Sequence, residues 1–574
     1  MSTASRTSVT RTRHAPDPIA ATLRKVFGLK RLRPGQLEVI ERVLNATNTL
    51  AVMPTGAGKS LCYQLPALLL PGTTVVVSPL VALMKDQCDA LRALGVAAVQ
   101  INSALGSAEL AAARAAVASG SARIVLTTPE QIAEPALTSA LARHPVSLLV
   151  VDEAHCISEW GHDFRPAFLD IAPAVRALGE PTVLALTATA KPAVMDEITA
   201  QLGIAARDVV QAGAYRPNLR FAVEPLARAA DRQARALAFV AAHAGAGIVY
   251  TATVKCAEQL HAALAGTDMS VGLYHGRLSA AERAQAQDDF MAGRKRVMVA
   301  TNAFGLGIDK PDIRFVLHYQ MPASVDAYYQ EAGRAGRDGE EAICALLYVP
   351  QDRALQRFFL SGRYPALGDL QAVMALLQRP APAAGWSAEA IVEALDRPRA
   401  KVLVALSLLR SHKALRRTRA GRFNVLRVPD DDALQALLAG YRARREQDGA
   451  TLEAMVAYAQ SGRCRWQAVL AALGESASDS CGHCDNCQRL AELARLTPVL
   501  QPQQPIELPA TASKPRFADG DAVRAKRYGA GQVVEADLHS VTVQFPNGER
   551  RTFLPEFVRA ARQVRAAAQV AGLC

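Results

Sequence analysis

The sequence predicts an α/β protein with two doubly wound parallel sheets, followed by a mostly helical region and a small β-rich module. From residue 47 to 350, short β-branched runs alternate with alanine-rich helical stretches, which is the pattern of parallel strands joined by crossover helices. This alternation is too long for one domain, so we expect domains at 17–212 and 213–350, with a seam near Gly213–Asn218. The clearest expected strands are Thr74–Ser78, Ile124–Thr127, Leu148–Val151, Val183–Leu186, Ile248–Tyr250, Val297–Ala300 and Phe315–His318.

The composition indicates which class of binding partner and which cellular compartment to expect. The 65 basic and 53 acidic residues give a net charge of +12, which favours a polyanionic partner such as nucleic acid. No apolar run is long enough to span a bilayer, so we expect no membrane association and, by default, a cytoplasmic location. Six of the ten cysteines stand alone, which suits reduced thiols. Residues 1–16 are expected to be a disordered basic tail.

A glycine-containing segment after the first expected strand has the context of a phosphate-binding loop. It precedes a helical pattern, so backbone N–H groups and the helix N-terminus can face phosphates. Lys59 would reach the β- and γ-phosphates, and the Ser60 hydroxyl would ligate Mg²⁺. A chance glycine turn is the alternative, because Met53 stands where the motif usually begins with glycine. The expected ATP-binding residues of this loop are Met53, Pro54, Thr55, Gly56, Ala57, Gly58, Lys59 and Ser60.

Two adjacent carboxylates follow the expected strand at Leu148–Val151. Asp152 would hold Mg²⁺, usually through water, and Glu153 would orient and deprotonate the attacking water. Such a pair is common at strand ends. Combined with the phosphate loop, however, it predicts a site that hydrolyses a nucleotide.

The order of several motifs then resembles one known family. Asp152-Glu-Ala-His155 identifies a superfamily 2 helicase, and Cys156–Pro166 is similar to a loop peculiar to RecQ helicases. The resemblance covers residues 26–350 almost continuously. Its other segments are Arg33–Gln36, Ser78–Gln87, Thr128–Glu130, Leu186–Ala190, Ala300–Pro311 and Gln330–Gly339.

This resemblance implies two RecA-like domains and an ATP-dependent DNA helicase that moves 3′ to 5′ on single-stranded DNA. Such an enzyme unwinds duplex and forked or branched DNA in recombination, repair, replication and the SOS response. It would work as a monomer near the nucleoid. An RNA helicase, a duplex translocase without unwinding and a DNA scaffold with a decayed motor remain alternatives. The first is disfavoured by the Cys156–Pro166 loop, and the last by the intact ATP motifs.

The resemblance also assigns roles outside the phosphate loop. Gln36 would bond adenine, with help from Arg33, while Leu29 stands where relatives often have a stacking aromatic residue. Gln330, Arg334 and Arg337 would act from the second domain. We expect the two arginines, three residues apart, to share one helix face and to reach the γ-phosphate when the domains close, with Arg337 as the arginine finger. Surface ion pairs are the alternative role for such arginines.

The loop after the carboxylates carries candidate DNA contacts. Trp160 and Phe164 could stack on bases, and Arg165 could contact phosphate or stack, so that DNA binding would signal to Glu153. A buried, purely structural role for either ring remains open.

Four clustered cysteines predict a structural zinc site. Cys464, Cys481, Cys484 and Cys487 have the spacing C-x16-C-x2-C-x2-C, which suits four thiolates around Zn²⁺. His483 is a conceivable alternative ligand, and a redox pair or disulfides are rival interpretations. With the preceding helix at Leu452–Gln460, the cluster resembles the RecQ zinc-binding subdomain, which supports the second motor domain.

The helical region at 351–490 departs from typical RecQ proteins, in which a winged helix follows the cysteines. Here helices at Ser387–Leu395 and Ala400–Arg410 and strands at Ala414–Arg417 and Phe423–Arg427 predict a winged helix at about 385–430, ahead of them. Residues 397–429 hold ten Lys or Arg and no Asp or Glu, so we expect DNA binding, with a solvated charged face as the alternative. The candidate wing contacts are Lys413, Arg416, Arg417, Arg419 and Arg422.

The C-terminal part is expected to hold a linker at 491–515, a β module at 516–562 and a tail at 563–574. Five short alternating segments predict an SH3- or Tudor-like barrel, and the module resembles the C-terminal module of UvrD-type helicases. That resemblance implies a possible protein partner. No second winged helix and no helical HRDC domain are expected in this sequence.

Overall fold

The computed structural model describes residues 17–158, 166–305, 308, 310–362, 364–382, 385–418, 421–477, 479–496 and 515–561. The chain divides into two compact units, Met1–Leu493 and Ala494–Cys574. The predicted basic tail and most of the predicted linker and C-terminal tail lie outside the described residues.

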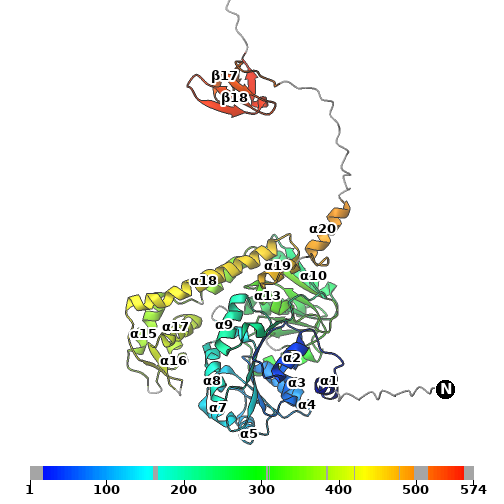
Figure 1. The fold of residues 1–574 in the computed structure, drawn as a ribbon, viewed down its shortest axis with the longest axis vertical. Coiled ribbons are helices and arrows are strands. Elements are labelled where there is room, and N and C mark those ends of the chain that lie inside the picture. Colours follow the sequence, from blue (N-terminus) through cyan, green and yellow to red (C-terminus); the bar gives the residue numbers. More distant parts are fainter. Residues whose placement is uncertain are drawn as a thin grey trace, which may run out of the picture. The chain divides into compact units, whose positions relative to one another are not determined.

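The first lobe is built on a seven-stranded parallel sheet in the order β3-β4-β2-β5-β6-β1-β7. Figure 1 labels most of the helices that surround this sheet. Helices cover both faces of this sheet, because each strand is apolar on both sides and two separate hydrophobic cores form. Its strands are β1 Thr49–Val52, β2 Thr73–Val77, β3 Ala98–Ile101, β4 Ile124–Thr127, β5 Val146–Val151, β6 Thr182–Thr187 and β7 Val209–Gln211. Its helices are α1 Pro18–Lys25, α2 Gln36–Leu44, α3 Leu61–Leu69, α4 Val81–Ala93, α5 Ser107–Ala118, α6 Pro129–Ile132, α7 Pro135–Leu141, α8 Ile171–Ala177 and α9 Pro192–Leu202.

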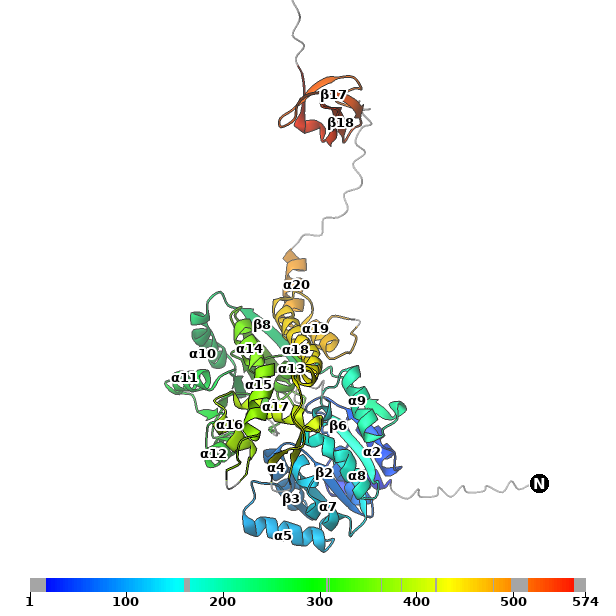
Figure 2. The same cartoon turned by 90° about the vertical axis from the view of Figure 1, so that its left-hand side faces the viewer.

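The second lobe is built on a six-stranded parallel sheet in the order β10-β11-β9-β12-β13-β8. Figure 2 labels β8 and the helices α10 to α13 of this lobe. The sheet begins at Leu219, and seven residues separate it from the end of β7, so the predicted seam falls in the connection between the sheets. Its strands are β8 Leu219–Pro225, β9 Ala246–Tyr250, β10 Val271–Tyr274, β11 Val297–Ala300, β12 Ile313–His318 and β13 Ala342–Tyr348. Its helices are α10 Arg232–Ala242, α11 Val254–Ala265, α12 Ala280–Met291 and α13 Val325–Ala332. The two predicted parallel-sheet domains are confirmed.

The predicted winged helix is present with more structure than expected. Besides α16 (Ala388–Ala394), α17 (Arg399–Ser411) and the hairpin of β14 (Leu415–Arg417) and β15 (Phe423–Val425), its core includes α15 (Leu367–Leu377). Leu434, Leu437 and Leu438 of the next helix complete that core.

That next helix corrects a predicted boundary. The helix expected at Leu452–Gln460 is the end of α18, which runs over 30 residues from Asp431 to Gln460. Its first turns pack in the winged-helix core and its last turns in the core shared by the second lobe and the cysteine cluster. Figure 1 shows α18 joining the two regions. The remaining helices are α14 Asp352–Ser361, α19 Arg465–Ala472 and α20 Asp485–Leu496.

The C-terminal unit holds a five-stranded antiparallel sheet in the order β19-β18-β17-β16-β20, with its own small core. The strands are β16 Ala522–Ala525, β17 Gly529–Ala536, β18 Val541–Gln544, β19 Arg550–Phe553 and β20 Val558–Ala560. The predicted module of five short strands is confirmed as an antiparallel sheet. Across the described residues, none of the helices has both the length and the apolar character needed to cross a membrane.

Candidate active site and zinc centre

The phosphate loop connects β1 to α3, and its conformation requires glycine. Gly56 and Gly58 have φ values of +86° and +77°, which side chains other than glycine rarely adopt. A Cβ on Gly58 would lie 2.7 Å from the amide nitrogen of Gln36, and one on Gly56 would lie 3.1 Å from Cγ of Arg337. The loop is therefore packed against residues of both lobes.

Lys59 and Ser60 are held by neighbours within the first lobe. The Lys59 ammonium donates to the Met53 carbonyl at 3.2 Å, and burial lowers its pKa. Gln87 donates to the Ser60 hydroxyl at 3.0 Å and accepts from the Tyr63 hydroxyl at 2.5 Å. Gln87 therefore fixes the oxygen expected to ligate Mg²⁺, a role that its motif on α4 did not reveal.

The two carboxylates after β5 lie in different environments. Asp152 is buried and accepts from the Ser78 hydroxyl at 3.1 Å. Burial, with a smaller contribution from the charge of Glu153, raises the pKa of Asp152 to about 7. Glu153 has a φ of +51° and lies 3.4 Å from Nδ1 of His155, which also contacts the Thr187 hydroxyl at 3.0 Å. This contact links the Asp-Glu-Ala-His segment to the end of β6.

Residues of both lobes line one cavity of about 730 Å³. Lys59, Ser60, Asp152 and Glu153 enter it from the first lobe, and the second lobe contributes Gln330, Arg334 and Arg337. The tertiary structure thus brings together all the residues predicted to act on the phosphates.

One prediction about these arginines is wrong. Arg334 and Arg337 do not share a helix face, because α13 ends at Ala332 and the chain then turns, with Gly336 at a φ of +55°. The Arg334 guanidinium donates to the carbonyl of Gly305. Arg334 lies two residues before Gly336, the glycine that the turn requires. The three-residue spacing was compatible with a helix, but α13 ends with Gly333 as its C-cap, and the positive φ of Gly336 is incompatible with a continued helix.

The residues expected around adenine lie at the edge of the same cavity. Gln36 donates to the carbonyls of Ala57 and Gly58 at 3.0 and 2.9 Å and accepts from the Arg33 backbone at 2.7 Å. Its amide is thus engaged with the loop itself. Arg33 reaches the carbonyl of Gly56 and, at 3.3 Å, that of Arg337. Leu29 lines the cavity with 44% of its surface exposed.

The donor set of the cavity fits a nucleotide with Mg²⁺. Among the described residues, the buried atoms of the lining that make no hydrogen bond include Oε2 of Glu153, Nε2 of Gln330 and Nε of Arg334. Such atoms normally find partners, so a ligand or water is expected there. The hydroxyl of Ser60 and the carboxylate of Asp152 are the hard oxygen ligands that Mg²⁺ prefers.

The four cysteines of the zinc prediction form one cluster. Their sulfur atoms all lie within 4.8 Å of one another. A tetrahedral Zn²⁺ with bonds of about 2.3 Å places its sulfur ligands roughly 3.8 Å apart, so the cluster fits zinc. Cys481 and Cys487 have sulfurs 4.0 Å apart and are not bonded as a disulfide.

Backbone N–H groups surround these sulfurs. The N–H of Cys481 donates to the sulfur of Cys464 at 3.3 Å, and the N–H of Cys484 donates to that of Cys481 at 3.4 Å. Although burial alone would raise it, such bonds lower the pKa of Cys464 to about 7, whereas burial raises the pKa of Cys481 and of Cys487. His483 lies outside the cluster, since its ring nitrogens contact the carbonyls of Cys481 and Leu219.

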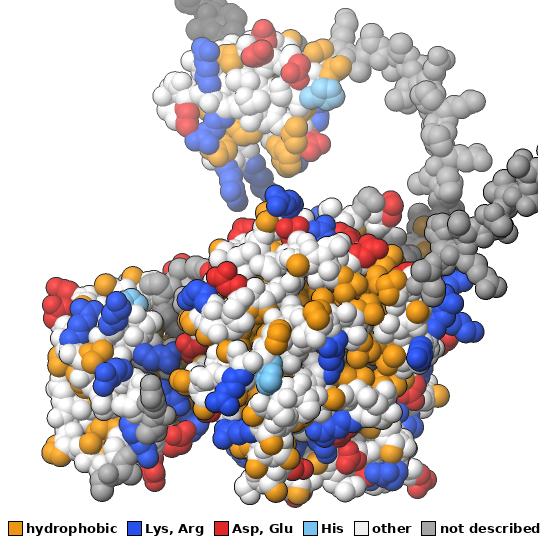
Figure 3. Space-filling view, turned by 60° about the horizontal axis from the view of Figure 1, so that its bottom comes forward, with side chains coloured by type: hydrophobic (Ala, Val, Ile, Leu, Met, Phe, Trp, Pro, Cys, Tyr) orange, Lys and Arg blue, Asp and Glu red, His pale blue; other side chains and the backbone are white. Residues whose placement is uncertain are grey.

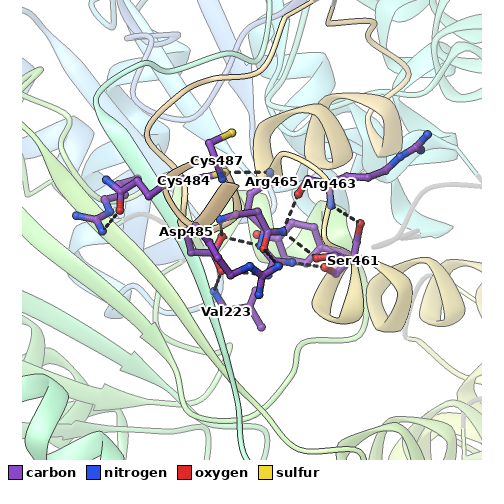
Figure 4. Close-up of polar contacts among 12 residues, drawn as sticks. Val223, Ser461, Arg463, Arg465, Cys484, Asp485 and Cys487 are labelled. Atoms are coloured by element: carbon purple, nitrogen blue, oxygen red, sulfur yellow. Dashed lines mark hydrogen bonds and ion pairs between the residues drawn. The ribbon is translucent and has the colours of Figure 1, made fainter. Parts of the chain in front are cut away.

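The residue after Cys484 anchors the cluster to the second lobe. Asp485 receives two bonds from Arg465 at 2.9 and 3.0 Å, and it accepts from the backbone N–H of Val223 in β8 at 2.9 Å (Figure 4). The zinc-binding region is therefore attached to the edge strand of the second sheet.

The predicted DNA contacts are described only in part. Trp160, Phe164, Arg165 and Arg419 lie outside the described residues. A second cavity of about 730 Å³ lies on the other side of Glu153, Gln330 and Arg334, which line both cavities. It also includes His155 and Cys156, where the predicted DNA loop begins.

The basic stretch of the winged helix separates into two sets. Arg397 and Lys401 pair with Asp369, and Arg399 lies 3.8 Å from Glu389. The wing residues Lys413, Arg416, Arg417 and Arg422 form no ion pair with another described residue. Figure 3 shows several Lys and Arg side chains on the surface of this region, at the left of the view. Among the described residues, the wing set therefore retains uncompensated charge for a phosphate partner, whereas Arg397, Arg399 and Lys401 at the start of the stretch do not.

Family models of known proteins match three segments of the chain. A DEAD/DEAH box helicase model matches residues 33–198, a helicase conserved C-terminal domain model matches 232–339, and a RecQ zinc-binding model matches 430–488. The last of these begins after the wing and includes all four cysteines.

Individual relatives agree with these matches. ATP-dependent DNA helicase RecQ of Bacillus subtilis is 45% identical over 339 residues, which are 58% of this chain and 56% of that protein. The probable ATP-dependent DNA helicase RecS of the same organism is 38% identical over 362 residues, or 62% of this chain and 72% of that protein. The chain thus spans about half the length of some curated relatives, including the first of these.

A solved structure has a similar fold. The DUF1998 helicase MrfA bound to DNA aligns with a TM-score of 0.50 at 19% identity, over 74% of this chain and 64% of that one. At this identity the likeness concerns the fold alone.

Proposed function

The chain belongs to the RecQ family of superfamily 2 helicases, and from this premise we propose that it is an ATP-dependent DNA helicase. One observation carries the proposal: a single cavity is lined by the phosphate loop and the Asp152–Glu153 pair of one lobe and by Gln330, Arg334 and Arg337 of the other. A site divided between two lobes can couple hydrolysis to lobe movement, because opening the lobes removes half of the catalytic groups.

Each residue then has a definite task. Lys59 holds the β- and γ-phosphates, and Ser60 and Asp152 hold Mg²⁺, which when bound neutralises phosphate charge. Glu153 orients the attacking water and accepts its proton. Arg337 is the proposed arginine finger, with Arg334 and Gln330 completing the second-lobe side. Leu29, Arg33 and Gln36 border the base, and Leu29 offers less stacking surface than an aromatic residue would.

We propose that DNA binding is coupled to ATP hydrolysis through the residues that line both cavities. Glu153, Gln330 and Arg334 face both, and the segment from Cys156 toward Trp160, Phe164 and Arg165 starts at the second cavity. We expect single-stranded DNA to occupy that side and to align Glu153. Movement from 3′ to 5′, roles in recombination, repair and replication, action as a monomer and a cytoplasmic, nucleoid-associated location follow from family membership and stay predictions.

A duplex-binding role for the winged helix is supported by its uncompensated wing charges. The exposed side of α17 carries Leu403 among its residues, and the basic residues near the start of that helix are paired with carboxylates. We therefore favour phosphate contacts by the wing over base readout by the helix. A protein partner for residues 516–562 also stays a prediction.

The decisive test measures ATP hydrolysis and strand displacement on matched DNA and RNA substrates that are tailed, forked or blunt. We expect hydrolysis stimulated by single-stranded DNA and unwinding of tailed and forked DNA duplexes. Stimulation by RNA alone would favour the RNA-helicase alternative. Hydrolysis stimulated by duplex DNA without strand displacement would favour a translocase.

A further inference from the structure

One arginine in the connection between the two sheets contacts both sides of the nucleotide cavity. The Arg216 guanidinium donates to four backbone carbonyls: those of Gly333, Ala335 and Gly336 at 2.7, 2.8 and 2.6 Å, and that of Thr55 at 3.2 Å. The first three belong to the second lobe, and Thr55 belongs to the phosphate loop. No carboxylate among the described residues pairs with this side chain.

The three second-lobe carbonyls explain why a cation is needed. They follow the end of α13 at Ala332, where carbonyls have no further helical N–H partners and carry the negative end of the helix dipole. A planar guanidinium has five N–H donors and can bond all four carbonyls at once, whereas an ammonium has only three donors. Arg216 therefore replaces the missing turn of helix and fixes the backbone on both sides of Arg334 and just before Arg337.

The fourth contact sets this turn against the phosphate loop. A Cβ on Gly56 would lie 3.1 Å from Cγ of Arg337 and 3.4 Å from Nη1 of Arg216, so both arginines pack on the same loop residue. Asn218 adds a bond to the Gly336 carbonyl at 2.8 Å, and a Cβ on Gly336 would lie 2.5 Å from its amide nitrogen. The turn, the connection and the loop thus form one close-packed unit.

The zinc-binding region holds this connection from outside. Glu475 accepts from the Ala214 backbone N–H at 3.0 Å, and the Trp466 indole donates to the Leu219 carbonyl at 3.0 Å. The Trp466 ring also packs edge-on against Tyr215, with ring centres 4.9 Å apart. Arg216 therefore extends from a segment that is fixed on either side, rather than from a free linker.

We propose that Arg216 is a positioning residue for ATP hydrolysis: it holds the Gly333–Gly336 turn in register with the phosphate loop so that Arg337 meets the γ-phosphate. The proposal rests on the function proposed above, because it acts through the arginine finger assigned there. Arg216 itself touches backbone carbonyls and is not a catalytic residue.

The first test compares three single variants in the full chain at saturating single-stranded DNA. Arg216→Ala should lower kcat by about 100-fold, the scale expected when a reacting group is misplaced by about 1 Å, with ATP affinity changed much less. Arg216→Lys should recover only part of this loss, because it keeps the charge but not the fork. Arg220→Ala is the matched control, since Arg220 is an exposed residue of β8 whose bond goes to Gln488.

The deciding test is a double-mutant cycle with Arg337→Ala, followed by single-turnover hydrolysis. If Arg216 acts through Arg337, the double variant should hydrolyse ATP at the rate of Arg337→Ala alone. Losses that multiply would mean an independent role and would overturn the inference, as would a normal kcat in Arg216→Ala. Retained hydrolysis in Arg337→Ala would first overturn the finger assignment of the proposed function, and the positioning role with it. Thermal melting of each variant separates these effects from unfolding.

Discussion

At the scale of single residues, the adjacent carboxylates of Asp152 and Glu153 lie in different surroundings, which suit them to different roles. Asp152 is buried and bonded to Ser78, whereas Glu153 holds a left-handed backbone conformation and presents an oxygen without a hydrogen-bond partner among the described residues. A residue other than glycine in that conformation costs free energy, and such strain is often found at functional sites. The fixed oxygen of Asp152 suits metal coordination. The Glu153 oxygen, which lies 3.4 Å from Nδ1 of His155 but makes no hydrogen bond with a described residue, suits proton transfer.

The residue-scale prediction concerns Glu153→Gln. The amide keeps the shape but cannot accept the proton of the attacking water, so DNA-stimulated kcat should fall by about 10²–10⁴-fold. ATP should still bind, because the phosphate loop is untouched. Steady-state hydrolysis and equilibrium binding of a fluorescent ATP analogue measure the two quantities. Lys59→Ala is the contrasting variant, which should lose binding as well as turnover. Near-normal turnover in Glu153→Gln would mean that another group is the base.

At the scale of elements, the wing and the cysteine cluster make separate contributions. The hairpin of β14 and β15 carries basic side chains that no described carboxylate neutralises. The cluster is formed by residues before α19 and at the start of α20, and it holds these helices against β8. One element is thus suited to contact a polyanion, and the other to maintain the geometry of the second lobe.

The wing prediction uses salt dependence. Replacing Arg416, Arg417, Arg419 and Arg422 with Ala should weaken binding to duplex and forked DNA. It should also flatten the slope of log affinity against log salt by about 0.9 for each lost phosphate contact. Hydrolysis stimulated by single-stranded DNA should change less. Affinity measured over a salt series tests this, with Arg397→Ala and Arg399→Ala as controls from the carboxylate-paired set. An unchanged slope would leave the wing arginines with a solubilising role only.

The zinc prediction concerns stability. Elemental analysis should find one Zn²⁺ per chain, and Cys484→Ser should lose it and lower the melting temperature, because a structural zinc site supplies folding free energy. Cys256→Ser is the matched control, since this thiol lies outside the cluster. A metal-free wild-type protein of unchanged stability would contradict the structural role.

At the scale of the larger unit, Met1–Leu493, the two lobes contribute opposite walls of the nucleotide cavity and share a second cavity beside it. The 30-residue helix α18 links the winged-helix core to the second lobe. When the lobes open and close, the winged helix should therefore move with the second lobe. Such an arrangement would join the winged helix, which we propose binds duplex DNA, to one half of the proposed motor.

The prediction at this scale is directional movement. Partial duplexes with only a 3′ overhang should be unwound faster than those with only a 5′ overhang, because the RecQ family implies 3′ to 5′ motion along the gripped strand. Strand displacement with each substrate, at equal ATP hydrolysis, provides the measurement, and a blunt duplex serves as the control. Preference for the 5′ overhang would contradict the family-based direction.

The sequence by itself determined the parts whose signal is local. The strands of both sheets follow from short apolar runs, the phosphate loop from Gly56, Gly58 and Lys59, and the zinc site from the spacing of four cysteines. Only the tertiary structure could place the turn after α13. The spacing of Arg334 and Arg337 allowed a longer helix, and the carbonyls of the turn are held by Arg216, which is more than 100 residues away. The tertiary structure alone revealed that Gln87 bonds the Ser60 hydroxyl and that Arg216 bonds four carbonyls, because these partners lie 27 to 161 residues apart in the sequence. For Arg216 the acceptors are backbone carbonyls, which leave no side-chain pattern in the sequence.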